Sequence, residues 1–250
     1  MVIFLFLCIG GFLAAFVDSI AGGGGLISMP VLLLSGLPPH IALGTNKFGG
    51  SFGCLSSAYR YAKSGATNKN LLKKLIPFTI LGSILGVTCV LSISDEILNI
   101  MVFIMILSVA IYTYKSKTLG TENNFEELTN KNIKLGIIMA FSLGFYDGFF
   151  GPGTGTFLVF ALIKIYSFDF LHASANTKIL NFTSNFTALI LFIINGQIFY
   201  KIAIFYAISM ILGGYVGAKV AIKKGSTLIK PIFLIMALCV CAKLIYQTIF

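Results

Sequence analysis

Long apolar runs alternate with short polar or basic loops along nearly the whole chain. About 20 apolar residues in a helix cross the hydrocarbon core of a membrane, so this pattern predicts an all-α, polytopic transmembrane bundle. The runs lie near residues 1–20, 26–36, 41–59, 75–93, 96–114, 135–150, 155–166, 173–194, 201–222 and 231–249. The runs near 26–36 and 155–166 would make helices of only about 16–18 Å. Each is expected to be a half-helix, a re-entrant piece or a shielded short span.

The two halves of the chain are copies of one unit. Asp18 in AAFVDSIAGGGG matches Asp147 in GFYDGFFGPGTG, and Thr45-Asn46-Lys47 matches Asn176-Thr177-Lys178. Equivalent glycines and methionines continue this register for most of each half: Gly65 with Gly196, Gly82 with Gly213, Gly86 with Gly217 and Met105 with Met236. We therefore expect a first repeat at 1–117, a polar cytoplasmic linker at 118–134 and a second repeat at 135–250.

Composition and charge place these runs in lipid. Hydrophobic residues make up 57% of the 250 and charged residues only 10%, against about a quarter charged in a soluble domain. The net charge of +10 is not a nucleic-acid footprint, because its cations gather in short loops between apolar runs, as in cytoplasmic loops. They are Arg60, Lys63, Lys69, Lys73, Lys74, Lys115, Lys117, Lys131, Lys134, Lys223, Lys224 and Lys230.

These loop charges also predict that the two repeats are inserted upside down relative to each other. The basic loop near 60–74 and the linker are expected inside, whereas the cation-free loop at 92–95 is expected outside. In the second repeat the basic loop is the one at 223–225, and the loop at 194–201 carries a single lysine. The chain is thus expected in the inner membrane, as inverted repeats with both termini outside.

Two sets of helix breaks, one in each copy, mark the expected functional site. Inverted-repeat transporters bind substrate near the bilayer midplane at discontinuous helices, and the positive end of a broken helix favours anions. The first set is Gly22–Gly25, equivalent to Gly151–Gly155. From it we expect four glycines to contact the substrate: Gly23, Gly24, Gly153 and Gly155. Close helix packing through small residues is the alternative explanation.

The second set places hydroxyl, amide and ammonium groups within otherwise apolar runs. The residues expected to face the substrate are Thr45, Asn46, Lys47, Asn176, Thr177 and Lys178. Asp18 and Asp147 are expected to orient the lysines or to carry a coupling proton. Because a charge at the centre of a membrane helix costs about 2.5–3.5 kcal/mol, these charges must face a cavity or each other. Two purely structural Asp–Lys pairs remain the alternative.

A further polar stripe occurs in the second copy at Asn181, Ser184 and Asn185, while the corresponding stretch of the first copy is rich in glycine. We expect these three residues to line an asymmetric site. The chain shows no ATP-binding motif and no catalytic or metal-binding motif, so no enzyme activity, cofactor or metal is expected. The expected partners are a small anion and the lipid bilayer.

These motifs resemble the TauE/SafE sulfite exporter family, particularly its YfcA-like branch. The resemblance covers essentially the whole chain and rests on residues 18–30, 42–47, 144–155 and 173–185. It implies a transporter of sulfite or sulfur-containing organic anions, most often an exporter, with eight membrane segments. The repeat itself favours ten segments, with the short ones included. Two other functions stay open at this point, an anion channel and a membrane accessory or assembly protein without transport.

Overall fold

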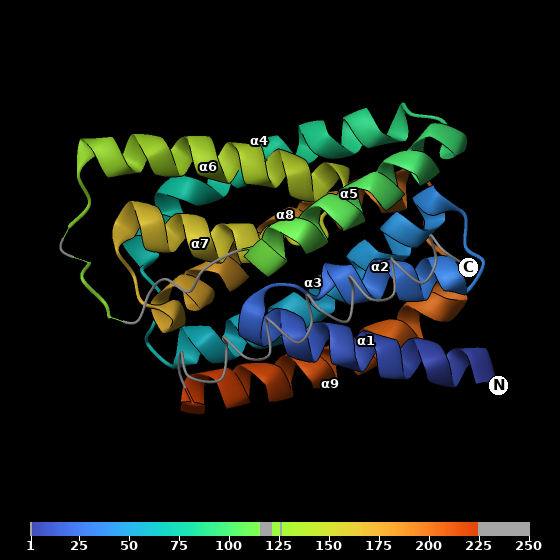
Figure 1. Cartoon of the computed structure of the whole chain (residues 1–250), viewed down its shortest axis with the longest axis horizontal. Coiled ribbons are helices and arrows are strands. Elements are labelled where there is room, and N and C mark those ends of the chain that lie inside the picture. The colour runs from blue at the N-terminus through green and yellow to red at the C-terminus, as the bar shows by residue number, and fades with distance from the viewer. Residues whose placement is uncertain (1, 116–121, 126, 225–250) are drawn as a thin grey trace.

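The chain folds almost entirely into helices. The computed structural model describes residues 2–115, 122–125 and 127–224, so the apolar run at 231–249 and part of the linker lie outside the described residues. Within these ranges there are helices and no strand. The helices are α1 (Val2–Ala21), α2 (Gly25–Leu34), α3 (Pro39–Lys63), α4 (Lys69–Leu91), α5 (Asp95–Lys115), α6 (Asn130–Phe149), α7 (Thr154–Tyr166), α8 (Phe170–Ile194) and α9 (Tyr200–Lys224) (Figure 1).

Four of these helices are long and apolar enough to cross a membrane, namely α1, α4, α8 and α9. Together with the composition they identify a membrane protein. The short runs also fold as helices, α2 with 10 residues and α7 with 13. At 1.5 Å per residue these are about 15 and 20 Å long, too short to cross a core of about 30 Å.

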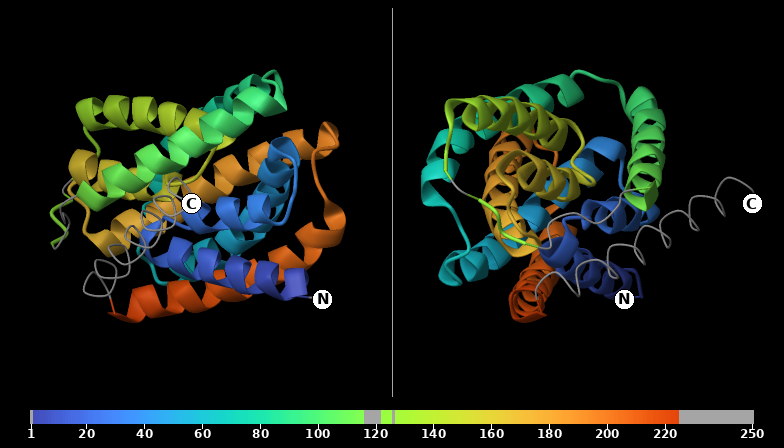
Figure 2. Two further views of the ribbon diagram at one scale, coloured as in Figure 1. Left: turned by 45° about the vertical axis from the view of Figure 1, so that its right-hand side comes forward. Right: turned by 60° about the vertical axis from the view of Figure 1, so that its left-hand side comes forward.

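Each short helix folds back along the helix before it. The side chain of Val31 in α2 fills the space beside Gly10 in α1, and Gly24 lies against Ala14. In the second copy the Tyr166 hydroxyl at the end of α7 donates to the Asn132 carbonyl near the start of α6, at 3.0 Å. Both copies therefore begin with a helical hairpin, and the short apolar runs are its returning arms (Figures 1 and 2).

The fourth helix of the first copy packs on the first helix of the second copy. At Gly82 and Gly86 of α4 an added Cβ would meet the backbone of Phe141 and Phe145 in α6 at 2.2 and 2.1 Å. Small residues of this kind let membrane helices approach backbone to backbone.

The reciprocal contact joins α9 of the second copy to α1 of the first. A Cβ at Gly213 or Gly217 would meet the backbone of Phe12 or Phe16 at 2.2 or 2.3 Å. These are the equivalents of the glycines and phenylalanines in the α4–α6 contact. The two copies thus exchange equivalent contacts, as expected if a pseudo-twofold axis relates them.

The loops gather at two ends of the bundle. The Asn124 amide donates to the Ser167 carbonyl at 2.9 Å, and the Asn68 amide donates to the Asn176 side chain at 2.8 Å. We call this end, with the linker and the α3–α4 and α7–α8 loops, the linker face. The other end, the N-terminal face, carries the α2–α3, α4–α5 and α8–α9 turns.

The two hairpins enter the bundle from these opposite ends. In Figure 1, α1 runs from the N-terminal face towards the linker face, and α6 runs the other way. The basic residues Lys69, Lys73 and Lys223 lie on helix ends at the linker face, and Asp95 and Glu96 lie at the N-terminal face. The two hairpins are thus antiparallel within the bundle, and the side of the membrane on which each face lies stays a prediction from the loop charges.

Two apolar clusters fill the interior and leave a polar layer between them. On α3 one cluster contains Leu43 and the other contains Tyr61. On α8 the same two clusters contain Phe192 and Leu180. The polar residues at 45–54 of α3 and 181–185 of α8 lie between these cluster positions, so the fold concentrates polar side chains at one depth of the bundle.

We expect the linker face to be cytoplasmic. In a variant without the five native cysteines, an impermeant thiol reagent added outside should label Ser94→Cys and Asn195→Cys. The same reagent should leave Ser64→Cys unlabelled until the cells are opened. Labelling of Ser64→Cys from outside in intact cells would contradict the inverted topology.

Gly22→Ala should destabilise the protein far more than Gly65→Ala. Both glycines have φ of +77°, so each alanine pays about 1–2 kcal/mol for the left-handed backbone. Only at Gly22 would the new Cβ overlap a neighbour, the carbonyl carbon of Gly155 at 2.3 Å, because nothing lies within 4 Å at Gly65. Thermal unfolding in detergent measures the difference, and equal losses would contradict the close packing of Gly22 against Gly155.

Candidate functional site

The tips of the two hairpins meet inside the bundle. An added Cβ at Gly22 would lie 2.3 Å from the carbonyl carbon of Gly155, and one at Gly25 would lie 2.6 Å from the Cα of Pro152. The Thr156 hydroxyl donates to the Ala21 carbonyl across this contact, at 3.1 Å. The glycine-rich breaks therefore serve close packing and also bring the starts of α2 and α7 together.

Left-handed backbone explains why the breaks require glycine. Gly22 has φ of +77° between α1 and α2, and Gly151 and Gly153 have φ of +99° and +87° between α6 and α7. Any other residue would be strained there. These turns end the first helix of each copy and place the starts of α2 and α7 inside the bundle.

Two ion pairs cross between the copies beside these tips. Lys47 Nζ lies 3.1 Å from Asp147 Oδ1 and also donates to the Asp147 backbone carbonyl. Lys178 Nζ lies 2.6 Å from Asp18 Oδ2. Both lysine side chains are only 1% exposed, so each ammonium depends on its carboxylate for neutralisation. Each pair joins the third helix of one copy to the first helix of the other.

The two carboxylates have different hydrogen-bond donors. Asp147 Oδ2 accepts from the Ser184 hydroxyl at 2.5 Å and from the Asn185 amide at 3.0 Å. Asp18 accepts from the Gly24 backbone amide at 3.3 Å and faces the Cys54 thiol at 3.7 Å. A thiol is a weak donor, so Asp147 is held more fully than Asp18.

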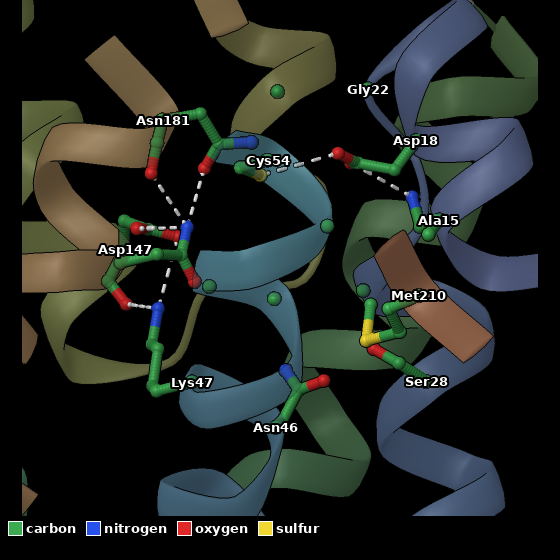
Figure 3. Close-up of a pocket in the computed structure, with 17 residues that line it drawn as sticks. Ala15, Asp18, Gly22, Ser28, Asn46, Lys47, Cys54, Asp147, Asn181 and Met210 are labelled. Carbon is green, nitrogen blue, oxygen red and sulfur yellow. Dashed lines mark hydrogen bonds and ion pairs between the residues drawn. The ribbon is translucent and has the colours of Figure 1, made fainter. Parts of the chain in front are cut away.

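A cavity of about 40 Å³ lies between the two ion pairs, with walls from both copies (Figure 3). One water needs roughly 10–15 Å³ of such space, so the cavity has room for a few waters or a compact solute. Its lining consists of Ala15, Asp18, Gly22, Gly24, Gly25, Ser28, Asn46, Lys47, Gly50, Gly53, Cys54, Asp147, Gly151, Gly155, Asn181, Asn185 and Met210.

One cavity residue has an unused polar atom. The Oδ1 atom of Asn46 is buried and has no hydrogen-bond partner, and the side chain lies at the cavity wall (Figure 3). A buried polar group without a partner costs about 1–3 kcal/mol. The Asn46 amide is therefore placed to bind something that the protein itself does not supply.

Most residues singled out in the sequence meet at this cavity. Eight of them line it: Asp18, Gly24, Asn46, Lys47, Asp147, Gly155, Asn181 and Asn185. Two more, Lys178 and Ser184, stand behind the lining and hold the aspartates. The remaining five are absent from the lining: Gly23, Thr45, Gly153, Asn176 and Thr177.

Three of those five are polar side chains buried outside the cavity. The Thr45 hydroxyl accepts from the Phe199 amide at 3.2 Å and so fastens the α8–α9 turn. The Asn176 side chain accepts from the Asn68 amide and donates to the His172 carbonyl, joining α8 to the α3–α4 loop. Thr177 Oγ1 is buried without a partner, at the position equivalent to Asn46.

The sequence reading missed Ser28, Cys54 and Met210 as cavity residues. Cys54 stands in the first copy where Asn185 stands in the second, so carrying the repeat register through the glycine-rich stretch would have found it. Ser28 and Met210 carry no comparable signal, because their side chains resemble those of any packed membrane helix.

Lys47→Met should cost about 3–5 kcal/mol of stability, since it leaves the Asp147 carboxylate buried and unpaired. Adding Asp147→Asn to that variant should recover much of the loss, because the pair is then neutral and nearly isosteric. Thermal unfolding of the three variants in detergent provides the measurement. A double variant as unstable as the sum of the two single variants would show that the pair is not coupled.

Comparison with known proteins agrees with the geometry. A model of the family "Sulfite exporter TauE/SafE" matches residues 7–244. A "Probable membrane transporter protein" of Haemophilus influenzae is 39% identical, with 95% of this chain and 92% of the relative covered. "Probable membrane transporter protein ORF9" of Sinorhizobium is 34% identical, covering 96% and 91%.

"Probable membrane transporter protein YfcA" of Escherichia coli is 32% identical over 94% of this chain and 87% of the relative. No solved structure matches the chain. The resemblance inferred from the doubled Asp-Gly and Asn-Lys motifs is thereby confirmed. The chain belongs to the TauE/SafE sulfite exporter family and is related along nearly its whole length to probable membrane transporters.

Proposed function

We propose that this protein is a secondary transporter that carries a small anion through the cavity between its two repeats. The observation that carries the proposal is Asn46, whose buried side chain lies at the wall of that cavity, keeps its Oδ1 unbonded to the protein and has an NH2 group that can donate to an anion. Membership of a membrane transporter family leaves three points open, which we propose here: the charge of the substrate, its path and the alternating-access mechanism.

The cavity offers several features that favour a negative solute. The starts of α2 and α7 converge on it through Gly25 and Gly155, and helix starts carry partial positive charge and free amides. The side-chain NH2 groups of Asn46 and Asn181 add donors at the wall, whereas Asn185 and Lys47 already donate to Asp147. An oxyanion of the size of sulfite, or the head of a sulfonate, matches this donor set.

Sulfite or an organosulfur anion is the proposed substrate class, and export is the proposed direction. Both come from the family description. The donors themselves recognise an oxyanion and are indifferent to its central atom. Reconstitution into liposomes with sulfite, sulfonates, sulfate and chloride separates these substrates.

The exchanged contacts of the two copies support alternating access as the proposed mechanism. Each hairpin tip lies against the tip of the other copy, at the Gly22–Gly155 contact. The tips touch backbone to backbone there, which supports a carrier whose halves rock around a fixed site rather than an open pore. Saturable flux is the expected behaviour, whereas unsaturable conductance would indicate a channel.

Asn46→Ala should weaken anion binding without unfolding the protein. Its Oδ1 atom makes no hydrogen bond in the protein, so truncation costs little stability, while it removes the NH2 group that would donate to the anion. We expect a five- to tenfold rise in the substrate concentration for half-maximal flux in liposomes, which corresponds to about 1–1.4 kcal/mol.

Ser56→Ala is the matched control. Ser56 lies on the same helix, and its hydroxyl donates to the Ile211 carbonyl away from the cavity. This variant should keep the wild-type concentration dependence. An Asn46→Ala protein that transports every tested anion like the wild type would argue against this cavity as the substrate site.

A further inference from the structure

The charged cluster around the cavity is electrically balanced. Among the residues that the structure describes, Lys47, Lys178 and Asp147 are buried charged side chains, and Asp18 is 14% exposed. Two ammonium groups and two carboxylates sum to zero. An anion that enters this low-dielectric site therefore adds an uncompensated charge, which is costly in a membrane interior.

We propose that the anion is carried together with one proton, and that Asp18, not its equivalent Asp147, is the group that binds this proton. The inference rests on the proposed function and specifies how the site balances its charge. With the proton on Asp18 and a monovalent anion beside it, the loaded site is again neutral.

Asp147 is unsuited to that role because it is fully engaged. Its side chain is 2% exposed and holds Lys47, the Ser184 hydroxyl and the Asn185 amide. A proton on either aspartate leaves its buried lysine without a counter-charge, but on Asp147 it would also disrupt the hydrogen bonds from Ser184 and Asn185. Each such loss costs about 1–3 kcal/mol, more for the charged group.

Asp18 has fewer and weaker partners and opens onto the cavity. Its carboxylate is held by Lys178 at 2.6 Å, by the Gly24 amide at 3.3 Å and by the Cys54 thiol at 3.7 Å. A proton on Asp18 therefore weakens one strong contact, the ion pair with Lys178, whereas a proton on Asp147 weakens three. Asp18 is also the more accessible of the two cavity carboxylates, because its side chain is 14% exposed, against 2% for Asp147.

The other titratable groups around Asp18 do not compete for this role. On α3 the Tyr61 hydroxyl donates to the Ser19 carbonyl and is fully buried. Lys47 and Asp147, on the opposite side of the cavity, neutralise each other. Lys178 comes from α8 and is the partner already described.

The repeat itself shows where the difference between the two aspartates arises. The positions equivalent to Ser184 and Asn185, the donors to Asp147, are Gly53 and Cys54 in the first copy. Asp147 thus has two strong side-chain donors, Ser184 and Asn185. At the equivalent positions beside Asp18, Gly53 offers no donor and Cys54 offers only a thiol. These two positions are therefore where the hydrogen bonding of the two otherwise equivalent aspartates differs.

The transport step is balanced in protons and charge. A solvent proton forms an O–H bond on the Asp18 carboxylate, and the carboxyl group becomes neutral. The charge of the Lys178 ammonium is then no longer cancelled and attracts the anion, to which the Asp18 O–H can donate. When the anion leaves on the other face the proton leaves as well, and the Asp18–Lys178 pair re-forms. The cycle moves no net charge with a monovalent anion, and its direction follows the combined gradients.

The test uses the purified full-length protein in liposomes with two probes, sulfite and labelled methanesulfonate, a monovalent anion that does not titrate near neutral pH. Exchange of internal for external anion at equal pH measures transport alone, because it requires no net movement of protons. Net methanesulfonate flux, recorded with an internal pH dye and a voltage-sensitive dye, reports coupling. The expected result is one proton moved with each anion and no response of flux to membrane potential.

Asp18→Asn should make net flux independent of pH and sensitive to membrane potential, because the amide imitates the protonated carboxyl permanently. Asp147→Asn changes the net charge identically and is the matched control. It should instead lower stability, and any flux that it retains should still carry a proton.

Cys54→Asn gives Asp18 the donor that Asp147 already has, and it keeps the charge. A hydrogen bond to the carboxylate favours its ionised form, so the pH at which transport is half-maximal should move in the acidic direction. This variant keeps the inference testable even where Asp147→Asn fails to fold.

Four outcomes would overturn the inference. Net methanesulfonate flux without proton movement, or proton-coupled flux that persists in Asp18→Asn, would contradict the coupling while leaving an anion transporter intact. An unchanged pH profile in Cys54→Asn would contradict the role of Asp18. If neither probe exchanges, the proposed substrate class fails, and the coupling inference falls with it.

Discussion

The pairing of two buried lysines with two aspartates of the opposite repeat is the interaction on which the rest of the structure depends. Four charges at membrane depth would cost about 10–14 kcal/mol if each remained exposed to lipid. Lys47 with Asp147 and Lys178 with Asp18 avoid this cost only because the third helix of one copy lies beside the first helix of the other. Neither copy can neutralise its own charges with these contacts, so the charged residues require the two halves to be assembled.

Backbone contact between the hairpin tips is the second constraint, and it explains the glycines. Gly22 and Gly155 touch where a methyl group would not fit, and the same turns direct the starts of α2 and α7 into the interior. Structural packing and anion binding are therefore not competing explanations of the glycine runs. A bulky side chain at either glycine would keep the tips apart and would also fill the cavity. The same glycines therefore allow close packing and leave space for an anion.

Much of this architecture could be predicted from the sequence because it is written twice. The equivalence of Asp18 with Asp147, and of Lys47 with Lys178, predicted that four charges share one site, and the short apolar runs predicted the arms that return as α2 and α7. What the register could not predict is which lysine meets which aspartate, since pairing within a copy and between copies gives the same pattern. It also could not separate Asn46, which lines the cavity, from Thr45, which fastens the α8–α9 turn, because adjacent residues on a helix differ by about 100° in direction. The role of Cys54 was hidden for another reason, because a cysteine in an apolar run resembles any small packed residue.

The central claim is that the two repeats enclose a polar, anion-binding space at their interface. The most direct measurement is a cryo-electron microscopy map of the protein in lipid nanodiscs, recorded with and without saturating sulfite. The account predicts density for the anion between Asn46, Asn181 and the start of α2 in the loaded sample, with both ion pairs crossing between the repeats. A cavity packed shut by side chains, or lysines that face lipid, would contradict it.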